Sequence, residues 1–150
     1  EAAKQGKSKE EILAVIEDIL SRVHVYAALP TLKYLAMGGR MGKLTAGIAE
    51  TLNIKPILTA RDGKLELLEK VRTLKKAEAR LIELACESAE GKEIESIALI
   101  HVNNVEGVKA LFTKLQTVLH FESEPLIMEF TAGLSVHAGS GVIGYVLLTK

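Results

Sequence analysis

Apolar residues recur at helical spacing in three separate segments of the chain. Ser8 and Glu11 form the capping-box pattern that begins a helix. Behind them lies one apolar stripe made of Ile12, Val15, Ile16, Ile19, Leu20 and Val23. A second helix is predicted from Thr73 to Gly91, with the apolar positions Leu74, Ala77, Leu81, Leu84 and Ala85. A third helix is predicted after Asn104, with the apolar positions Val108, Leu111, Phe112, Leu115 and Val118.

Shorter apolar runs between these helices predict six strands. They cover residues 24–29, 53–61, 64–72, 97–102, 125–130 and 142–148. Asp62 and Gly63 form a strong signal for a two-residue hairpin turn, and the glycine-bearing residues 131–141 are interpreted as a loop. A hairpin combined with strands that are joined through helices predicts an α/β (α+β) two-layer sandwich, with a mixed, mostly six-stranded sheet and helices packed on one face.

Residues 31–42 are the most distinctive part of the chain. They predict a short apolar helix, then a turn at Gly38 and Gly39, then Arg40 at the start of a small-residue helix over residues 43–52. Two adjacent glycines permit backbone conformations that a side chain would forbid. The alternative is a helix that ends at a glycine and is followed by a surface arginine. Because a helix and not a strand precedes this turn, the segment does not fit a dinucleotide-binding fingerprint.

Length, charge and cysteine usage limit the class of protein. The 150 residues predict a single domain, and the 19 Lys and Arg balance the 19 Asp and Glu, which does not favour nucleic-acid binding. A single cysteine, Cys86, fits a reducing compartment, so a cytoplasmic location is expected. We expect neither a transmembrane segment nor a signal peptide. Hydrophobic residues make up 48% of the chain and aromatic residues only 4%, which predicts an aliphatic core.

Candidate chemistry centres on His137, which lies between two predicted strands and is followed by small residues. It is either a functional group or a loop histidine without a role. His101 and His120 lie in or beside apolar runs and are interpreted as structural. The histidines have no metal-ligand spacing, so no metal is expected. A small hydrolase that pairs His137 with Ser135 or Ser140 is an alternative, but no third residue is evident that would orient the histidine.

Five basic residues lie close together near the start of the second predicted helix. They are Lys70, Arg72, Lys75, Lys76 and Arg80. This pattern is typical of a solvated helix face. The functional alternative is a docking patch for an acidic or phosphate-bearing partner.

Four segments together resemble the carboxy-terminal part of the DegV family of bacterial fatty-acid-binding proteins. They are residues 32–40, with Leu-Lys-Tyr-Leu and Gly-Gly-Arg; residues 52–63, with Leu-Asn-Ile-Lys-Pro-Ile-Leu and Asp-Gly; residues 70–77, with Lys-Val-Arg-Thr and Lys-Lys-Ala; and residues 137–144, with His-Ala-Gly-Ser-Gly and a later glycine. Each segment is weak alone, but their order and spacing match the family over nearly the whole chain. Ser140 departs from the family pattern, in which a proline is common between the two glycines.

The resemblance implies that residues 1–150 are a lipid-binding carboxy-terminal domain and that the family's N-terminal α/β domain is absent from this chain. It implies that the apolar interior houses an acyl tail and that Arg40 and His137 lie near the ligand carboxylate. The residues implied for the ligand loops are Gly38, Gly39, Gly42, Ser135, Gly139 and Gly141. No other cofactor is implied.

Some family members are the acyl-binding subunit of a fatty acid kinase. The resemblance therefore implies that this chain is not itself the enzyme, that a separate kinase transfers the phosphoryl group, and that Arg72 engages the kinase. The residues agree with this chemistry, because Arg40 is a permanent cation and His137 can donate a hydrogen bond in either protonation state. The remaining alternative is an interaction or oligomerisation module without a ligand, since a partner domain's absence would expose apolar surface.

Overall fold

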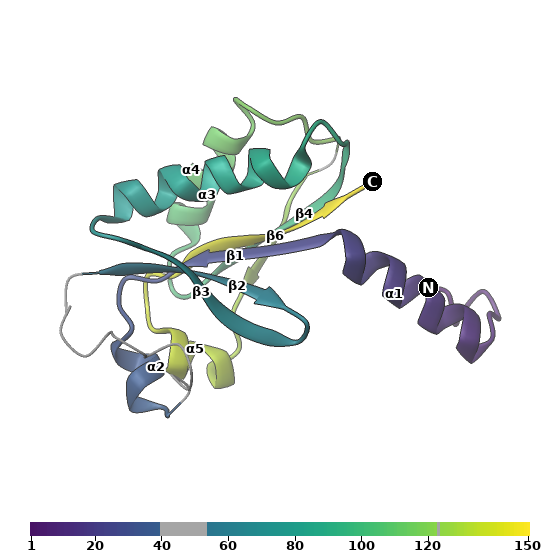
Figure 1. The fold of residues 1–150 in the computed structure, drawn as a ribbon, viewed down its shortest axis with the longest axis horizontal. Helices are drawn as coiled ribbons and strands as arrows, with labels where there is room; N and C mark the ends of the chain where they lie inside the picture. The colour runs from purple at the N-terminus through teal and green to yellow at the C-terminus, as the bar shows by residue number, and fades with distance from the viewer. Residues whose placement is uncertain (40–53, 123) are drawn as a thin grey trace.

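The computed structural model describes residues 1–39, 54–122 and 124–150. They form one six-stranded sheet with the strand order β3-β2-β1-β6-β4-β5 (Figure 1). The strands are β1 (Val23–Ala28), β2 (Lys55–Arg61), β3 (Lys64–Val71), β4 (Ile94–His101), β5 (Leu126–Glu129) and β6 (Ile143–Thr149). Only β4 and β5 run parallel, and every other neighbouring pair is antiparallel. The predicted mixed sheet is therefore confirmed.

The helices divide between the two faces of the sheet. They are α1 (Lys9–Arg22), α2 (Lys33–Met37), α3 (Leu74–Ala89), α4 (Val105–Leu115) and α5 (Ala132–Ala138). The long helices α3 and α4 cover one face, as predicted, while the short helices α2 and α5 lie together at the opposite face (Figure 1). The second face is thus only partly covered.

The predicted helix and turn signals form as the sequence indicates. Ser8 and Glu11 make both hydrogen bonds of the capping box. The side chains of Thr73 and Asn104 accept hydrogen bonds from backbone N–H groups in the first turns of α3 and α4. Gly63 has a φ of 70° in the hairpin between β2 and β3, which is a conformation that glycine adopts without strain.

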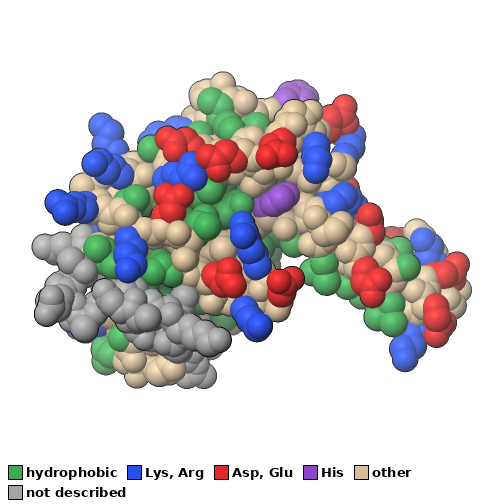
Figure 2. Space-filling view, viewed as in Figure 1, with side chains coloured by type: hydrophobic (Ala, Val, Ile, Leu, Met, Phe, Trp, Pro, Cys, Tyr) green, Lys and Arg blue, Asp and Glu red, His purple; other side chains and the backbone are tan. Residues whose placement is uncertain are grey.

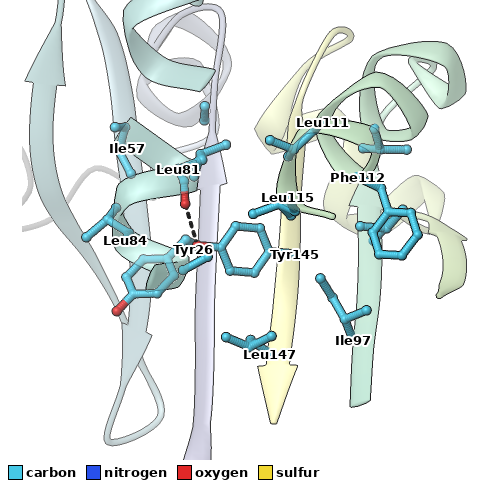
Figure 3. Close-up of a cluster of buried hydrophobic side chains, with 14 of the residues drawn as sticks. Tyr26, Ile57, Leu81, Leu84, Ile97, Leu111, Phe112, Leu115, Tyr145 and Leu147 are labelled. Atoms are coloured by element: carbon cyan, nitrogen blue, oxygen red, sulfur yellow. Dashed lines mark hydrogen bonds between the residues drawn. The ribbon is translucent and has the colours of Figure 1, made fainter. Parts of the chain in front are cut away.

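The larger hydrophobic core lies between the sheet and the helices α3 and α4 (Figure 3). Leu81, Leu111 and Leu115 of the helices meet Tyr145 and Leu147 of β6, and all five are fully buried. The Tyr145 hydroxyl donates a hydrogen bond of 2.7 Å to the Leu81 carbonyl. This hydrogen bond satisfies the hydroxyl group, so that Tyr145 is buried in the core without an unpaired polar atom.

A smaller cluster packs on the opposite face of the sheet. Its buried members are Leu29, Leu32, Leu35, Leu58, Val102, Ala138 and Val142. Side chains along β1 alternate between the two faces of the sheet. Tyr26 and Ala28 belong to the larger core, while Ala27 packs against the smaller cluster. The chain therefore has two apolar layers on one sheet.

Three predictions at the level of elements were wrong. Residues 131–141 are not only a loop, because residues 132–138 form α5. Val23 begins β1 and does not extend the stripe of α1, and Val118 is 52% exposed because α4 ends at Leu115. In the last two cases the apolar periodicity continues beyond the residue at which the helix ends. The helix predicted over residues 43–52 lies outside the described residues.

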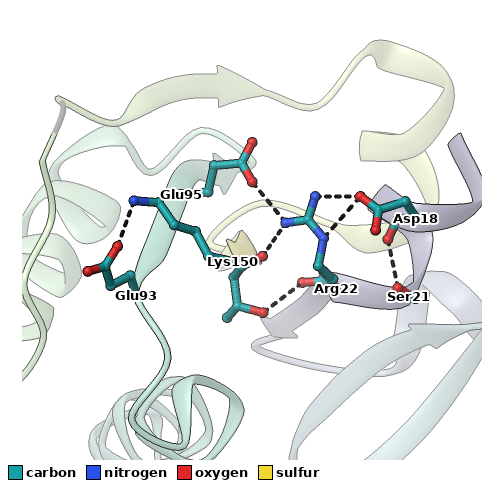
Figure 4. Close-up of polar contacts among 7 residues, drawn as sticks. Asp18, Ser21, Arg22, Glu93, Glu95 and Lys150 are labelled. Carbon is teal, nitrogen blue, oxygen red and sulfur yellow. Dashed lines mark hydrogen bonds and ion pairs between the residues drawn. The ribbon is translucent and has the colours of Figure 1, made fainter. Parts of the chain in front are cut away.

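Helix α1 projects from the side of the sheet (Figure 1) and has no buried residue. Arg22 fixes its base (Figure 4). The guanidinium contacts the carboxylates of Asp18 at 2.7 Å and Glu95 at 2.8 Å, and it also donates to the Thr149 carbonyl oxygen. The apolar stripe of α1 remains exposed, with Leu13 at 47%, Ile16 at 45% and Leu20 at 64%.

Candidate functional site

A cavity of about 440 Å³ opens on the second face of the sheet, beside α2 and α5. Part of its floor comes from Val25 and Ala27, which are alternate residues of β1, and from Leu29, which directly follows the strand. Further apolar side chains come from other elements and include Leu35, Leu58, Leu65, Ile100, Phe130 and Leu134. The lining is therefore almost entirely aliphatic and aromatic, as an alkyl ligand requires.

His137 reaches this pocket from α5. Leu134, His137 and Ala138 all line the cavity, and their spacing of three and four residues places them on one side of the helix. The His137 Nδ1 atom is enclosed, and it has no hydrogen-bond partner among the residues that the structure describes. His137 is the one ionisable side chain among the described residues that line the pocket.

Two glycines allow the helices α2 and α5 to pack closely against each other beside the pocket. A Cβ atom added to Gly38, at the end of α2, would lie 2.8 Å from the His137 Cε1 atom and closer still to Nδ1. A Cβ atom added to Gly139, at the end of α5, would lie 2.6 Å from the Tyr34 Cε2 atom. Gly139 also has a φ of 83°, which glycine adopts most readily. The turn at Gly38 and Gly39 and the segment around His137 are therefore in contact, although they are far apart in the sequence.

The other predicted ligand-loop residues have more varied positions. Gly39 adopts a φ of 66° in the turn after α2. Gly141 lies against Pro30, because a Cβ atom there would be 2.9 Å from the proline Cγ atom. Ser135 does not line the pocket, and its hydroxyl donates a 2.9 Å hydrogen bond to the Phe130 carbonyl. Arg40 and Gly42 lie outside the described residues.

The contacts of the two serines do not favour a Ser–His hydrolase. The Ser135 hydroxyl donates its hydrogen bond to the Phe130 carbonyl, just before α5, and the Ser140 hydroxyl accepts a 3.4 Å hydrogen bond from the Asn103 side chain. Within the described part of the chain, neither serine contacts His137 through a hydrogen bond. A nucleophile in such a mechanism needs a base within hydrogen-bonding reach.

The basic patch is exposed at the start of α3. Lys70, Arg72, Lys75 and Lys76 are all exposed there, and Figure 2 shows basic side chains gathered on that side of the molecule. Arg80 differs, since it forms ion pairs of 2.6 to 3.0 Å with three glutamates, Glu69, Glu83 and Glu87. The hydrogen bonds that Arg80 donates to these carboxylates, led by Glu87, raise its pKa. Arg80 is therefore engaged within the fold, whereas the other four basic side chains form no ion pair with another described residue.

Sequence reasoning missed most of the pocket lining. Alternation along the predicted strand over residues 24–29 is one available signal, since it places Val25 and Ala27 on the same face. The spacing of Leu134, His137 and Ala138 was a second available signal, and it was hidden by treating residues 131–141 as a loop. Of the two histidines interpreted as structural, His101 is buried and His120 is exposed.

Comparison with known proteins decides the family. A family model described as an uncharacterised protein of the DegV family matches residues 1–150. The chain belongs to the DegV family. A DegV domain-containing protein of Streptomyces coelicolor is 33% identical over 150 residues, which are 100% of this chain and 53% of the relative. One from Clostridium acetobutylicum is 32% identical over 149 residues, or 99% of this chain and 52% of the relative.

Solved DegV structures have the same fold. A fatty-acid-binding DegV protein from Streptococcus agalactiae superposes with a TM-score of 0.85 at 28% identity, over 99% of this chain and 52% of the other. A DegV protein from Thermus thermophilus, described by its fatty acid binding, gives 0.86 at 29% identity, over 99% and 53%. The chain spans about half the length of the DegV proteins that it matches. Over its described residues, no helix is both long and apolar enough to cross a bilayer.

Proposed function

We propose that this DegV chain is a carrier domain that binds a long-chain fatty acid. The tail occupies the apolar pocket under α2 and α5, and the carboxyl group lies beside His137. One observation carries the proposal: among the described lining residues, a single ionisable group stands in an otherwise apolar pocket. One ionisable group in an apolar cavity fits a molecule with one polar end and a long alkyl chain.

The affinity comes from the tail and the orientation from the head group. Burial of each CH₂ contributes about 0.8 kcal/mol, so a long alkyl chain supplies most of the binding free energy. The enclosed Nδ1 of His137 is best left as a bare acceptor, because a buried N–H without a partner is costly. The proton then resides on Nε2, which donates a hydrogen bond to the ligand's carboxylate.

Arg40 is proposed as the second group at the carboxylate. It follows Gly39 directly in the sequence, and the glycine turn packs against His137. A guanidinium offers a fork of donors that fits a carboxylate, and it stays charged when the carboxylate gains a phosphoryl group. Gly42 belongs to the same proposed ligand loop.

The proposal extends to phosphoryl transfer by a partner. The bound carboxylate is presented to a separate kinase, and Arg72 with its exposed basic neighbours forms the docking patch for that kinase. This chain supplies binding and orientation, and the kinase supplies the chemistry. We place these events in the bacterial cytoplasm.

The surface also supports a second, N-terminal domain in the complete protein. The pocket opens to the surface, and the stripe of α1 leaves Leu13, Ile16 and Leu20 uncovered. Exposed apolar patches of this kind mark interaction sites. We propose that the other half of the DegV length covers both regions. The alternative, favoured by the same exposed stripe, is that this chain acts as an oligomerisation module.

Native mass spectrometry of the protein purified from cells tests the proposal. The full-length protein is expected to carry co-purified acyl chains, and Arg40→Ala is expected to lower phosphorylation of the bound lipid more than retention of the tail. Lys33→Ala is the matched control, since Lys33 is an exposed cation on α2 that does not line the pocket. A spectrum without acyl chains at every chain length tested would contradict the carrier function.

A further inference from the structure

A second cavity, of about 590 Å³, opens where the parallel strands β4 and β5 end and α4 begins. Seven of the residues that the structure describes line it: His101, Asn103, Asn104, Val105, Glu106, Ile127 and Glu129. None of them lines the lipid pocket. In open α/β sheets, the carboxyl ends of parallel strands are a usual place for ligands. We call these seven residues the β4–β5 cleft.

His101 supplies a hydrogen-bond donor to this cleft. The residue is only 6% exposed, yet it lines the cavity. Its Nδ1 atom accepts a 3.4 Å hydrogen bond from the Asn104 backbone N–H, so the neutral imidazole carries its proton on Nε2. No residue in the described ranges forms a hydrogen bond with Nε2. Because Nδ1 is held by Asn104 and Nε2 has no described partner, the Nε2–H group can donate a hydrogen bond to a ligand atom.

Glu129 supplies an acceptor beside this donor. It is the last residue of β5, and its Oε1 atom accepts a 2.9 Å hydrogen bond from the Asn103 N–H. That bond orients the carboxylate and leaves the other oxygen for a ligand. Glu106 adds a second carboxylate in the first turn of α4, where it pairs with Lys109 at 3.6 Å and where the helix also presents N–H groups and the positive end of its dipole.

Charge then limits the class of ligand. An anion would meet the carboxylates of Glu106 and Glu129, and a cation would meet the His101 N–H and the positive end of α4. A hydroxyl group satisfies both sets, because it accepts from an N–H and donates to a carboxylate at once. The apolar walls, Val105 and Ile127, are each 38% exposed and suit the C–H surface of such a molecule.

We propose that the β4–β5 cleft binds a neutral polyol, such as a free sugar or glycerol, with Glu129 and the His101 Nε2–H group as its main hydrogen-bonding partners. This site is separate from the lipid pocket and does not depend on fatty acid binding. It goes beyond the carrier function, because it assigns this chain a second ligand of a different chemical class.

Amide-resolved NMR titration of the chain tests the proposal. D-glucose and glycerol are the probes, with inorganic phosphate and acetamide as the anionic and neutral-amide comparisons. We expect saturable shifts at the amides of residues 103–106 and 127–129 with at least one polyol, with a millimolar Kd. Absence of a saturable shift with both polyols, or stronger binding of phosphate or acetamide, would overturn it.

Variants separate the site from a general surface effect. Glu129→Gln keeps an acceptor for the Asn103 N–H but removes the charge, and we expect polyol binding to weaken about ten-fold. Glu124→Gln changes an exposed carboxylate outside the cleft and should leave binding unchanged. His101→Phe removes the donor and should abolish binding in a chain whose spectrum remains dispersed. Equal effects of the two glutamate substitutions would contradict the assignment.

Discussion

The His137 imidazole lies directly against Gly38, so that residue 38 has no room for even one methyl group. The contact joins the end of α2 to the last turn of α5. It also fixes one edge of the imidazole, the edge that carries Nδ1 and Cε1, against the backbone. The position of the only ionisable group among the described lining residues of the lipid pocket therefore depends on a glycine on another element.

Gly38→Ala should displace the His137 ring. Overpacking of this kind costs about 1–3 kcal/mol of unfolding free energy, and the His137 ring signals in a ¹H–¹⁵N spectrum should shift strongly. Gly39→Ala is the control, because its φ of 66° imposes backbone strain while no described atom lies within 4 Å of the new methyl group. Unchanged His137 signals in Gly38→Ala would show that the contact is absent in solution.

Fatty acid affinity should rise with chain length until the pocket is full. Each added CH₂ contributes about 0.8 kcal/mol, or about a four-fold change in Kd. Ala27→Ile fills part of the pocket floor and should shorten the preferred chain, whereas Ala60→Ile, at an exposed position outside the pocket, should not. Calorimetric titration with a series of saturated fatty acids measures both effects. An affinity that does not vary with chain length would be inconsistent with binding in this pocket.

Tyr145 should make stability depend on pH in the alkaline range. Burial, reinforced by the nearby Tyr26, raises the pKa of Tyr145 above its usual value of 10.0. Because the folded pKa is the higher one, the stabilisation is complete below pH 10 and falls as the pH rises further. The slope is about 1.4 kcal/mol per pH unit for one linked proton.

The measurement is denaturant unfolding between pH 9 and pH 11 for the wild type and Tyr145→Phe. The variant should lose about 1–2 kcal/mol at neutral pH, because the hydrogen bond from the Tyr145 hydroxyl to the Leu81 carbonyl is lost, and it should lack the additional alkaline slope. Tyr34→Phe alters a tyrosine that is 39% exposed and serves as the control. The same slope in Tyr145→Phe and the wild type would disprove the assignment.

Arg22 should control the order of α1. Its contacts with Glu95 of β4 and Thr149 of β6 link the helix base to the sheet, and Asp18 of α1 holds the guanidinium in place. Arg22→Met should speed hydrogen exchange at the α1 amides while the amides of β6 stay protected, since α1 has no buried residue to hold it. Arg61→Met, an exposed arginine in the hairpin, is the control. Unchanged exchange in α1 would mean that other contacts hold the helix.

The sequence predicted elements whose signals are local. Ser8, Thr73 and Asn104 cap their helices as expected, and the hairpin at Asp62 forms as expected. Each of these signals depends on residues within a few positions of one another. Strand order and the burial of both faces of β1 depend on contacts between distant segments, so local signals do not predict them.

Helix α5 shows where local signals fail. Gly133 lowers its helix propensity, and Thr131 makes no side-chain cap, so a helix of seven residues left little pattern to detect. Its stability comes from packing against α2 through Tyr34, Gly38 and Gly139. The meeting of His137 with the glycine turn was expected from the family resemblance, since composition and periodicity carry no information on contacts between distant segments.

The central claim is that an acyl tail lies on the face of the sheet opposite α3 and α4, with its carboxyl end at His137. The most direct measurement is a set of intermolecular NOEs from ¹³C-labelled palmitate bound to the protein. The account predicts contacts from the alkyl chain to the methyl groups of Val25, Ala27 and Leu134, and from the carboxyl end to the His137 ring. Contacts to α3 or α4 instead, or palmitate that binds without reaching His137, would contradict it.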